Sequence, residues 1–452
     1  MKFNRVIFFW TLIISIFCMI VLPSLFSKGM FLDGVTYASI SRNLAFGNGS
    51  ILHPYYTESL YPKFHEQPPF FFLIQSFFFK VLGDFIWVER IFSAILLIFS
   101  IFGIKLLWEK LYEKEPIYKN SYLPVLLFLT TPIVIWSFQN NIIENLLIPL
   151  SIFSVYFLLL EGKKYDFNLI VSASLLVISF FTKGPVGLFP LTVPLFIWYF
   201  LNKPIRQFLT FYLSFFLLII IAFLVEDIRQ NFLLFLENQL FPAIAGKREV
   251  TTNTRFKILY KLFLELLFPI SLTILTLIVL RNRVFLKNGK GLLFVAIGLS
   301  ASVPLMITLK QRSHYILPSI PFFIIGFSIF IMPFLGKFEK HVKRKVLFIL
   351  PLSLFFTSIS LMISNKGQKL RDIKLQIDLE ILNEKTKFDV SIDNDIYSDW
   401  GLHAYAQRYY QKSFNVSDNK TFRLLKKEKN LPKGFLSTDI KLNRYQLAQK
   451  IN

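Results

Sequence analysis

The stretch FLDGVTYASISRNLAFGNGSILHPYYTESLYPKFHEQPPF, residues 31–70, decides how this chain of 452 residues folds. It is polar and aromatic, and it lies between an apolar run at residues 6–26 and a second apolar run that begins near residue 70. A stretch of about forty residues is too long for a connecting turn, and long ordered loops are usually functional. Asp33 stands where the chain leaves the first run, and Glu66 stands where it enters the second. These two carboxylates therefore bracket the first candidate site.

The composition is typical of a membrane protein. Hydrophobic residues make up 54% of the chain and charged residues 17%, whereas soluble domains carry about 25% charged residues. Apolar runs of roughly 18 or more residues recur up to residue 364, and this length crosses about 30 Å of hydrocarbon. Because lipid cannot satisfy backbone polar groups, we expect these spans to be helices. Spans are predicted near residues 6–26, 68–83, 85–108, 122–138, 142–160, 169–182, 184–201, 208–226, 258–280, 292–309, 313–335 and 346–364.

The formal net charge of +22 raises the question of nucleic acid as a partner. The basic residues concentrate in short loops between apolar spans, as in cytoplasmic anchors that face anionic lipid. We therefore expect the basic residues to contact the lipid bilayer and not nucleic acid. Cys18 is the only cysteine, so the chain has no disulfide framework. Lys2 and Arg5 precede the first span, which predicts an uncleaved anchor with a cytoplasmic N-terminus.

The distribution of basic loops predicts the topology. Segments 281–291 and 336–345 are the most cationic and should face the cytoplasm. The turn around Lys183, the segment 227–257 and the turn at residues 310–312 then fall outside, together with everything beyond residue 364. This arrangement predicts a multi-pass protein of the plasma membrane, the inner membrane in a bacterium.

One conflict in this topology concerns the number of spans. Glu66 and Glu144 should both lie outside, yet an odd number of apolar segments separates them. Either the short segment 68–83 is not a crossing, or one segment hides a second. With the N-terminus inside and the C-terminus outside, we expect an odd number of transmembrane helices within the range of 11 to 13.

The chain divides at residue 364. Residues 1–364 form the predicted transmembrane domain, with outer loops at 27–67 and 227–257. Residues 365–452 hold no run long enough to span a membrane, and we expect a small extramembrane α/β lobe. Its predicted elements are the β-like stretches DVSIDNDIY and GFLSTDIKL and the helical stretch WGLHAYAQRYY.

Many polar residues fall on the predicted outer side although they come from distant parts of the sequence. Polar groups at the ends of apolar spans are costly to desolvate, so a cluster of them marks a site. The set comprises Asp33, Arg42, His53, Tyr55, Tyr56, Glu58, His65, Glu66, Gln67, Asn140, Asn141, Glu144, Lys183, Arg248, Lys310, Arg312, His314 and Tyr315.

Four motifs of this set, the first of them in two parts, resemble a known family. Residues 33–43 (DGVTYASISRN) and 66–69 (EQPP) resemble the first outer loop of the lipid-dependent GT-C glycosyltransferases, nearest in pattern to the aminoarabinose and protein mannosyl transferases. Residues 144–147 (ENLL) resemble the second acidic motif of the family. Residues 181–187 (FTKGPVG) and 310–318 (KQRSHYILP) are similar to its two basic motifs. The resemblance covers roughly residues 5 to 335, and all four segments follow in the family's order.

The resemblance implies transfer of a sugar from a polyprenyl-phosphate donor to an envelope lipid, polysaccharide or protein acceptor, with inversion at the anomeric carbon. A hydroxyl is a poor nucleophile, and a carboxylate that takes its proton accelerates attack by about 10²–10⁴-fold. Asp33 is the candidate base; alternatively it caps a helix that begins near Thr36. Glu66 is a candidate for orienting the acceptor or holding a cation. Glu144 either contacts substrate or is a satisfied carboxylate at a helix end.

The leaving lipid phosphate needs cations near its developing charge. Lys183 and Arg312 are the main candidates, with Lys310 and His314 beside them; the alternative for each cation is contact with lipid headgroups. Candidate substrate-binding residues are Tyr55, Tyr56, His65 and Tyr315. The tyrosines are alternatively part of an interfacial aromatic belt. No H-x-x-x-H spacing occurs, so we expect no cofactor, with a divalent metal as the weaker alternative.

Two departures from the family and two rival functions remain open. Gly34 stands where the family often has a second acid, and Gln67 stands where it often has a lysine. A transporter or flippase of lipid-linked sugars would carry ionisable residues at mid-membrane, and Glu265 and the Glu89–Arg90 pair lie inside predicted spans. A non-enzymatic assembly scaffold with an exported lobe is the other alternative.

Overall fold

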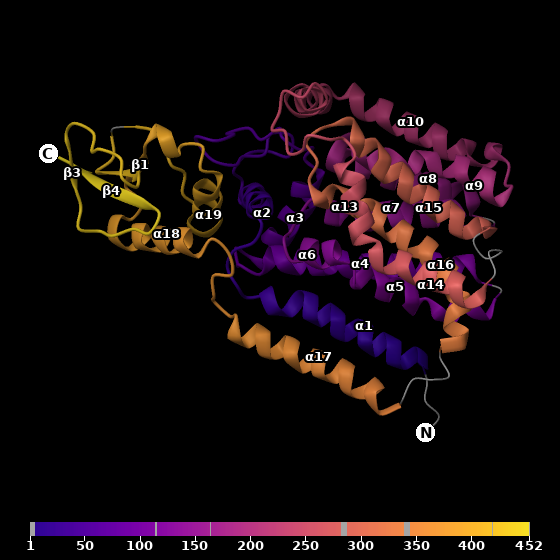
Figure 1. The fold of residues 1–452 in the computed structure, drawn as a ribbon. Helices are drawn as coiled ribbons and strands as arrows, with labels where there is room; N and C mark the ends of the chain where they lie inside the picture. The colour runs from indigo at the N-terminus through magenta and orange to yellow at the C-terminus, as the bar shows by residue number, and fades with distance from the viewer. Residues whose placement is uncertain are drawn as a thin grey trace.

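The computed structural model describes residues 5–113, 115–162, 164–281, 287–338, 344–417 and 419–451. Most of the chain forms a bundle of helices, and the C-terminal residues form a separate lobe at one end of it (Figure 1). We call this end of the bundle the lobe end. The N-terminus lies at the opposite end, where α1 (Arg5–Val21) begins beside α17 (Arg344–Ser364).

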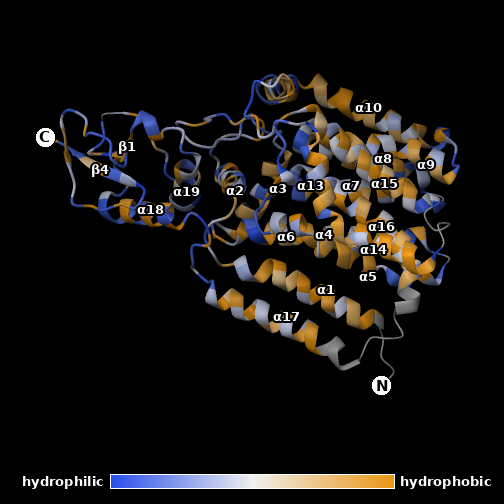
Figure 2. Ribbon diagram, viewed as in Figure 1, coloured by the Kyte–Doolittle hydropathy of each residue, from blue (hydrophilic) through white to orange (hydrophobic). Residues whose placement is uncertain are grey.

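Long apolar helices build the bundle, and hydrophobic residues cover them while hydrophilic residues dominate the lobe (Figure 2). Six helices among the described residues are long and apolar enough to cross a membrane, or up to eight if each of two bent pairs is one span. The all-α multi-pass fold predicted from the sequence is confirmed, and the count of 11 to 13 spans stays a prediction. Further helices of the bundle are α4 (Val88–Leu111), α5 (Tyr122–Leu129), α6 (Pro132–Phe138), α7 (Glu144–Leu159), α8 (Tyr165–Lys183), α9 (Val193–Leu201), α10 (Leu209–Leu224), α11 (Glu226–Phe235), α13 (Lys257–Glu265), α14 (Leu267–Leu280), α15 (Gly289–Ser302) and α16 (Ile320–Phe338).

The segment 68–83 is not a crossing. It forms α3 (Phe70–Leu82), a helix of only 13 residues that packs against α2 (Leu32–Ala45). The loop before α3 contacts the lobe, since the Tyr397 hydroxyl donates to the carbonyl of Ser59 at 2.6 Å. The residues after α3 also contact the lobe, since Asp84 pairs with Arg408 at 2.7 Å. Both ends of α3 therefore lie at the lobe end, which removes the conflict over Glu66 and Glu144.

The predicted spans 169–182 and 184–201 are the two arms of a hairpin. Helix α8 ends at Lys183, and the chain returns through the 3-10 helix Gly184–Thr192 into α9. The returning arm packs closely on α8, because a Cβ on Gly187 would lie 2.5 Å from the backbone oxygen of Ser179. Lys183 is thereby placed at the tip of a tight turn.

Two apolar spans are each bent at a break between two helices, and the two breaks lie next to each other. Helices α5 and α6 meet at 76°, and α13 and α14 meet at 64°. Glu265 joins the two breaks, because its carboxylate accepts a hydrogen bond of 2.8 Å from the backbone N–H of Ile133 at the start of α6. A free helix N-terminus needs such an acceptor. Glu265 thus has a structural partner inside the bundle.

The C-terminal lobe is a small α/β unit, as predicted. Its four-stranded sheet has the order β1-β2-β4-β3, parallel between β1 and β2 and antiparallel elsewhere. The helix predicted at WGLHAYAQRYY is α19 (Trp400–Tyr410), and the two predicted β-like stretches contain β1 and β3. The other elements are α18 (Ile373–Thr386), β1 (Val390–Ile392), β2 (Phe422–Lys426), β3 (Phe435–Ser437) and β4 (Tyr445–Lys450).

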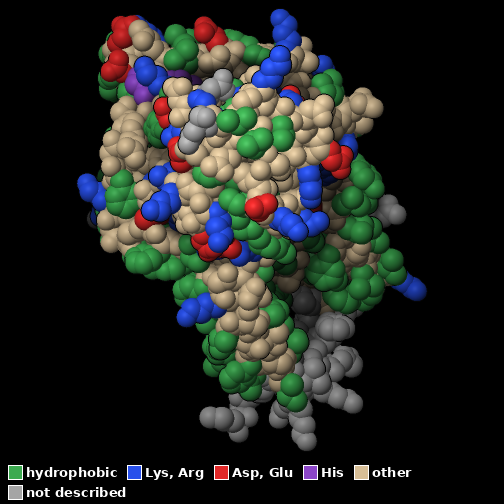
Figure 3. All heavy atoms as spheres, turned by 90° about the vertical axis from the view of Figure 1, so that its left-hand side faces the viewer, with side chains coloured by type: hydrophobic (Ala, Val, Ile, Leu, Met, Phe, Trp, Pro, Cys, Tyr) green, Lys and Arg blue, Asp and Glu red, His purple; other side chains and the backbone are tan. Residues whose placement is uncertain are grey.

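The lobe is continuous with the bundle rather than tethered to it. Its hydrophobic core includes Val35 in the first turn of α2 and Met30 just before that helix. The face of the molecule that carries the lobe shows basic and acidic side chains intermixed, and apolar side chains gather below them (Figure 3). The cationic segments 281–291 and 336–345 fall partly outside the described residues, so their cytoplasmic placement stays a prediction.

Candidate active site

A polar cavity of 90 Å³ lies at the lobe end of the bundle, and charged residues from distant parts of the chain meet in it. Three of its elements come from the family-like segments: α2, the turn after α8 and the segment before α16. Asp33 and Lys183, which are 150 positions apart in the sequence, line this one cavity. The full lining comprises Asp33, Thr36, Tyr37, Phe64, Glu66, Gln67, Lys183, Gln239, Lys310, Arg312, His314, Tyr315 and Trp400.

Asparagine side chains fix the helix start that carries Asp33. Asn140 accepts a hydrogen bond from the backbone N–H of Phe31 at 2.6 Å, and Asn141 donates to the carbonyl of Gly34 at 3.1 Å. A Cβ on Gly34 would overlap the carbonyl oxygen of Asn140. The second acid that the family often carries at this position would therefore not fit here. Close backbone contact sets the position of Asp33 instead.

Asp33 does not cap its helix. Helix α2 begins at Leu32, its N-cap residue is Phe31, and no side chain bonds the cap. Among the described residues, none donates a hydrogen bond to the Asp33 carboxylate. Burial raises the pKa of this carboxyl, although the charges of Arg312, Lys183 and Lys310 oppose the rise. A carboxylate with a raised pKa and free lone pairs is suited to accept a proton.

Lys183 is held by a buried acid. Its ammonium forms an ion pair with Glu144, which is 1% exposed at the start of α7. His314 also approaches Glu144, with 3.7 Å between the Nε2 and Oε1 atoms. The ring of Tyr315 lies 4.9 Å from the Lys183 nitrogen. Glu144 is thus a satisfied carboxylate behind the cavity, where it orients Lys183, and it is not part of the cavity lining.

Arg312 and Lys310 differ in their partners. Arg312 donates to Glu249 at 2.9 Å, near the rim. The Lys310 ammonium makes no hydrogen bond or ion pair with any of the described side chains. Burial, together with the neighbouring charges of Arg248 and Arg312, lowers the pKa of Lys310. An anion in the cavity would relieve both effects, which makes Lys310 a stronger candidate for phosphate contact than its sequence position suggests.

Glu66 lies on the loop side of the cavity. It accepts hydrogen bonds from the Tyr61 hydroxyl at 2.8 Å and from Arg248 at 3.3 Å. Gln67, which replaces the lysine frequent in the family, also lines the cavity. Glu66 is therefore oriented by two donors and remains at the cavity edge.

Three predicted substrate-binding residues do not line the cavity. Tyr55 lies against the lobe, 3.5 Å from the hydroxyl of Ser413. His65 contacts His53 and, at 3.1 Å, Asn231. Tyr56 is fully buried and forms the layer behind Thr36. Loop residues that are close in sequence point in different directions here, so we do not place Tyr55 or His65 in the site.

Several lining residues were not among the sequence candidates. Thr36 and Tyr37 follow Asp33 on α2, where a spacing of three to four residues places side chains on one face. Gln239 belongs to a π-helix (Leu236–Leu240), a distortion frequent at functional sites. Trp400 comes from the C-terminal lobe, and no local sequence signal links it to Asp33.

An apolar groove of 440 Å³ opens from the polar cavity. It runs between the 3-10 helix after α8, the helix α12 (Phe241–Ile244) and the end of α15. The two spaces share Glu66, Gln67, Lys183, Gln239, Lys310 and Tyr315. A wider pocket of 530 Å³ lies on another side and shares Arg312 and His314 with the cavity. The cavity thus connects to two further spaces, and one of them is mostly apolar.

Metal binding has no assembled ligand set in the part of the chain that the structure describes. No group of three or more His, Cys, Asp or Glu side chains comes together there as a metal site requires. The expectation that the protein needs no cofactor stays a prediction.

Comparison with known proteins agrees with this architecture. Residues 66–225 match the family described as dolichyl-phosphate-mannose-protein mannosyltransferase. No curated protein sequence matches the chain. The fold is similar to crystal structures of ArnT from Cupriavidus metallidurans, with bound undecaprenyl phosphate (TM-score 0.64, 12% identity) and in the apo state (TM-score 0.64, 14% identity). Each likeness covers 98% of this chain and 97% of the other.

A weaker similarity links the chain to the apo oligosaccharyltransferase of Archaeoglobus fulgidus, with a TM-score of 0.49, 11% identity, and coverage of 92% of this chain and 65% of the other. The resemblance found in the sequence motifs is confirmed. The chain therefore has the GT-C fold over nearly its whole length, and the family match over residues 66–225 indicates a glycosyltransferase.

Proposed function

We propose that the protein transfers a sugar from a polyprenyl-phosphate donor to an acceptor in the cavity at the lobe end, with Asp33 as the base. One observation carries the proposal: the apolar groove adjoins the cavity and shares Lys183 and Lys310 with it, and Asp33 lines the part of the cavity that the groove does not share. A lipid chain in the groove would place its phosphate at these cations. The undecaprenyl phosphate bound to the similarly folded ArnT supports a donor of this class.

The leaving phosphate is stabilised by fixed cations. Glu144 orients the Lys183 ammonium, and the Lys310 ammonium has free donors. Both ammonium groups can therefore bond phosphate oxygens. Arg312 adds a third positive charge across the cavity. Such preorganised charge lowers the energy of the transition state more than that of the ground state.

The reaction is one displacement at the anomeric carbon. The acceptor oxygen forms a bond to this carbon while the bond to the phosphate oxygen breaks, and the electron pair leaves with the lipid phosphate. The acceptor proton moves to the Asp33 carboxylate. Attack from the side opposite the phosphate inverts the configuration.

The wider pocket provides an approach for the acceptor. It meets the cavity at Arg312 and His314, whereas the groove meets it at Lys183 and Lys310. An in-line displacement needs the nucleophile and the leaving group on opposite sides of the sugar. The separation of the two openings supports this arrangement. The acceptor class remains an envelope lipid, polysaccharide or protein.

The protein works at the outer face of the cell membrane in this proposal, with a cytoplasmic N-terminus and an external lobe. The opposite positions of the N-terminus and the lobe agree with this orientation (Figure 1). A transporter is less well supported, because the charges inside its spans have structural partners: Glu265 bonds a helix N-terminus and Glu89 pairs with Arg408.

Mass spectrometry of envelope glycolipids and glycoproteins tests the proposal. Source cells would carry the wild-type gene, no gene, or the Asp33→Asn variant at equal expression. We expect a sugar-sized mass addition that is present only with the wild-type gene, and its carrier would identify the acceptor. Identical spectra in all three strains would refute the transferase, and a normal addition in the variant would refute the base.

A further inference from the structure

We propose that the C-terminal lobe completes the sugar-binding part of the active site, with Trp400 as a specificity-determining residue. This inference rests on the proposed function, since it assigns a place to the sugar of the polyprenyl-phosphate donor. Among the residues of the lobe that the structure describes, Trp400 alone lines the cavity.

The connection between the groove and the cavity indicates where the sugar lies. Lys183, Lys310 and Tyr315 line both spaces, so the phosphate belongs at their junction. The sugar must then occupy the part of the cavity that the groove does not share. That part is lined by Asp33, Thr36, Tyr37, Phe64, Arg312, His314 and Trp400.

Trp400 is held beside the candidate base. Its indole N–H donates to the hydroxyl of Thr36 at 2.9 Å, and Thr36 lies one turn after Asp33 on α2. The ring is supported from the loop side by Tyr56, with 5.4 Å between centroids, and by Tyr61, with 5.8 Å between centroids. The polar edge of the indole is thus engaged, and the ring is fixed in orientation at the cavity wall.

A sugar is the ligand that this wall suits. One face of a pyranose ring presents C–H bonds, while its hydroxyls project around the rim. A rigid aromatic ring offers apolar area to the C–H face at a small cost in conformational entropy. Asp33 and Arg312 supply acceptors and donors for the hydroxyls. A lipid chain would not need these charged neighbours, and a phosphate would not need the aromatic ring.

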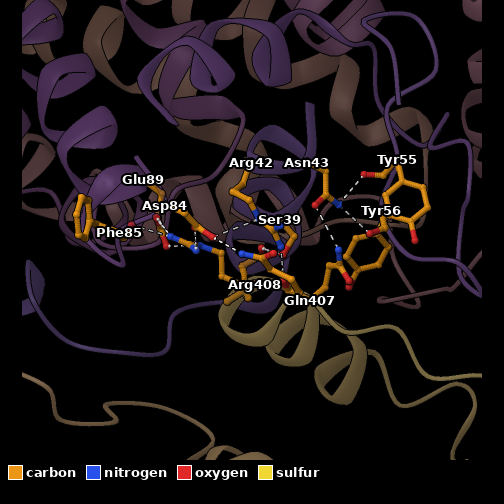
Figure 4. A network of polar contacts seen from close by, with 12 residues as sticks. Ser39, Arg42, Asn43, Tyr55, Tyr56, Asp84, Phe85, Glu89, Gln407 and Arg408 are labelled. Atoms are coloured by element: carbon orange, nitrogen blue, oxygen red, sulfur yellow. Dashed lines mark hydrogen bonds and ion pairs between the residues drawn. The ribbon is translucent and has the colours of Figure 1, made fainter. Parts of the chain in front are cut away.

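Buried ion pairs hold α19 in place, so the position of Trp400 is not adjustable. Arg408 donates to Glu89 at 2.8 and 3.1 Å and to Asp84 at 2.7 Å (Figure 4). Glu89 is completely buried. Arg42 on α2 adds to this cluster, because it lies 3.8 Å from the Asp84 carboxylate and donates to the carbonyl of Gln407 on α19 at 2.6 Å (Figure 4).

The same helix also bonds the chain that leads into Asp33. The hydroxyl of Tyr409 accepts from the backbone N–H of Gly29 at 2.8 Å, and the hydroxyl of Tyr405 donates to the carbonyl of Met30 at 3.2 Å. Helix α19 therefore positions both the candidate base and the aromatic ring beside it. Removal of one buried partner would disrupt this interface strongly.

Binding of two lipids to the purified, full-length protein separates a sugar-contacting role from a structural one. The probes are polyprenyl phosphate without sugar and polyprenyl phosphate carrying the sugar that envelope mass spectrometry identifies. We expect Trp400→Ala to weaken binding of the sugar-bearing lipid about 3- to 10-fold and to leave binding of the bare lipid unchanged. Trp400→Phe keeps the aromatic face and should retain most of the affinity for both lipids.

Trp198→Ala is the matched control, because Trp198 lies on α9 and is 52% exposed. It should change neither affinity. Equal losses of both lipids in Trp400→Ala, or a loss of affinity in Trp400→Phe as large as in Trp400→Ala, would make Trp400 a structural residue and overturn the inference. Failure of the wild-type protein to bind the bare lipid would instead refute the proposed function, and the inference with it.

Discussion

The two walls of the cavity are built in different ways. The bundle wall carries Lys183, Lys310 and Arg312, which lie at the ends of helices or in the turns between them. The opposite wall carries Asp33 and Trp400, which come from the first outer loop and the C-terminal lobe and lie 367 positions apart. In the proposed function, charge for the phosphate thus comes from local turns, whereas the groups around the sugar depend on contact between distant segments.

The walls also differ in how their charges are compensated. On the bundle wall, Lys183 is paired with Glu144 and Arg312 with Glu249, which leaves Lys310 as the cation without a bonded partner among the described residues. On the opposite wall, Asp33 has no bonded partner in the described part of the chain. Uncompensated groups face each other across the cavity, as expected where a substrate supplies the missing partners.

The largest expected effect on turnover comes from a substitution on the opposite wall, at Asp33. Asp33→Asn keeps the shape of the side chain and removes the base, so turnover should fall by about 10²–10⁴-fold. Binding of bare polyprenyl phosphate should be unchanged, because the cations of the bundle wall remain. Single-turnover sugar transfer and lipid binding by the purified protein measure the two quantities. Turnover within a few-fold of wild type would remove Asp33 from the mechanism.

Sequence patterns predicted most of the bundle wall. Apolar run lengths predicted the apolar helices, although the segment of α3 is not a crossing, and short motifs singled out Lys183, Lys310, Arg312 and His314, all of which line the cavity. These predictions succeed because a motif at a helix end constrains its own geometry. Helix α19 was also predicted over the residues it occupies, since its pattern is local.

The remainder depends on tertiary contacts. Trp400 and Gln239 enter the cavity only because their helices pack against the first loop, and no pattern within either segment encodes this. Tyr55 and His65 lie within the functional loop but point away from the cavity. Helix α3 has the composition of a span, and only its contacts at both ends reveal that it stays at the lobe end.

The second prediction compares Lys310, whose ammonium has no bonded partner among the described residues, with Lys183, which is paired with Glu144. Lys310→Ala should weaken binding of polyprenyl phosphate by about tenfold or more with little change in stability, because the ammonium has no bonded partner. Lys183→Met should weaken binding similarly and also destabilise the fold by about 3–5 kcal/mol, because it leaves Glu144 as an unpaired buried charge.

Lipid affinity and the thermal unfolding temperature in one detergent distinguish the two variants. In the double variant Lys183→Met/Glu144→Gln, stability should recover and lipid affinity should stay low. If lipid affinity recovered with stability, Lys183 would have only a structural role.

The third prediction concerns the backbone contact that fixes Asp33. Gly34→Ala places a methyl group against the carbonyl of Asn140, so α2 must shift. Overpacking of this kind costs about 1–3 kcal/mol, and the displacement of Asp33 should lower turnover more than donor affinity. Gly47→Ala is the control for destabilisation alone, because its φ of +84° strains an alanine while its Cβ would meet no atom within 4 Å. Equal turnover in both variants would show that the position of α2 is not critical.

The smallest expected effect follows from the raised pKa of Asp33. An unfolded chain holds this carboxyl at a pKa of about 3.9, so a higher pKa in the folded state means that burial of the carboxylate lowers the stability of the fold at neutral pH. Asp33→Asn should therefore raise the unfolding temperature slightly at neutral pH. The gain should vanish below the unfolded-state pKa, where the carboxyl is protonated in both states. Asp84→Asn removes an ion pair to Arg408 and should have the opposite sign. A lower unfolding temperature for Asp33→Asn at neutral pH would mean that this carboxylate stabilises the fold, and a lost activity in that variant would no longer identify a base.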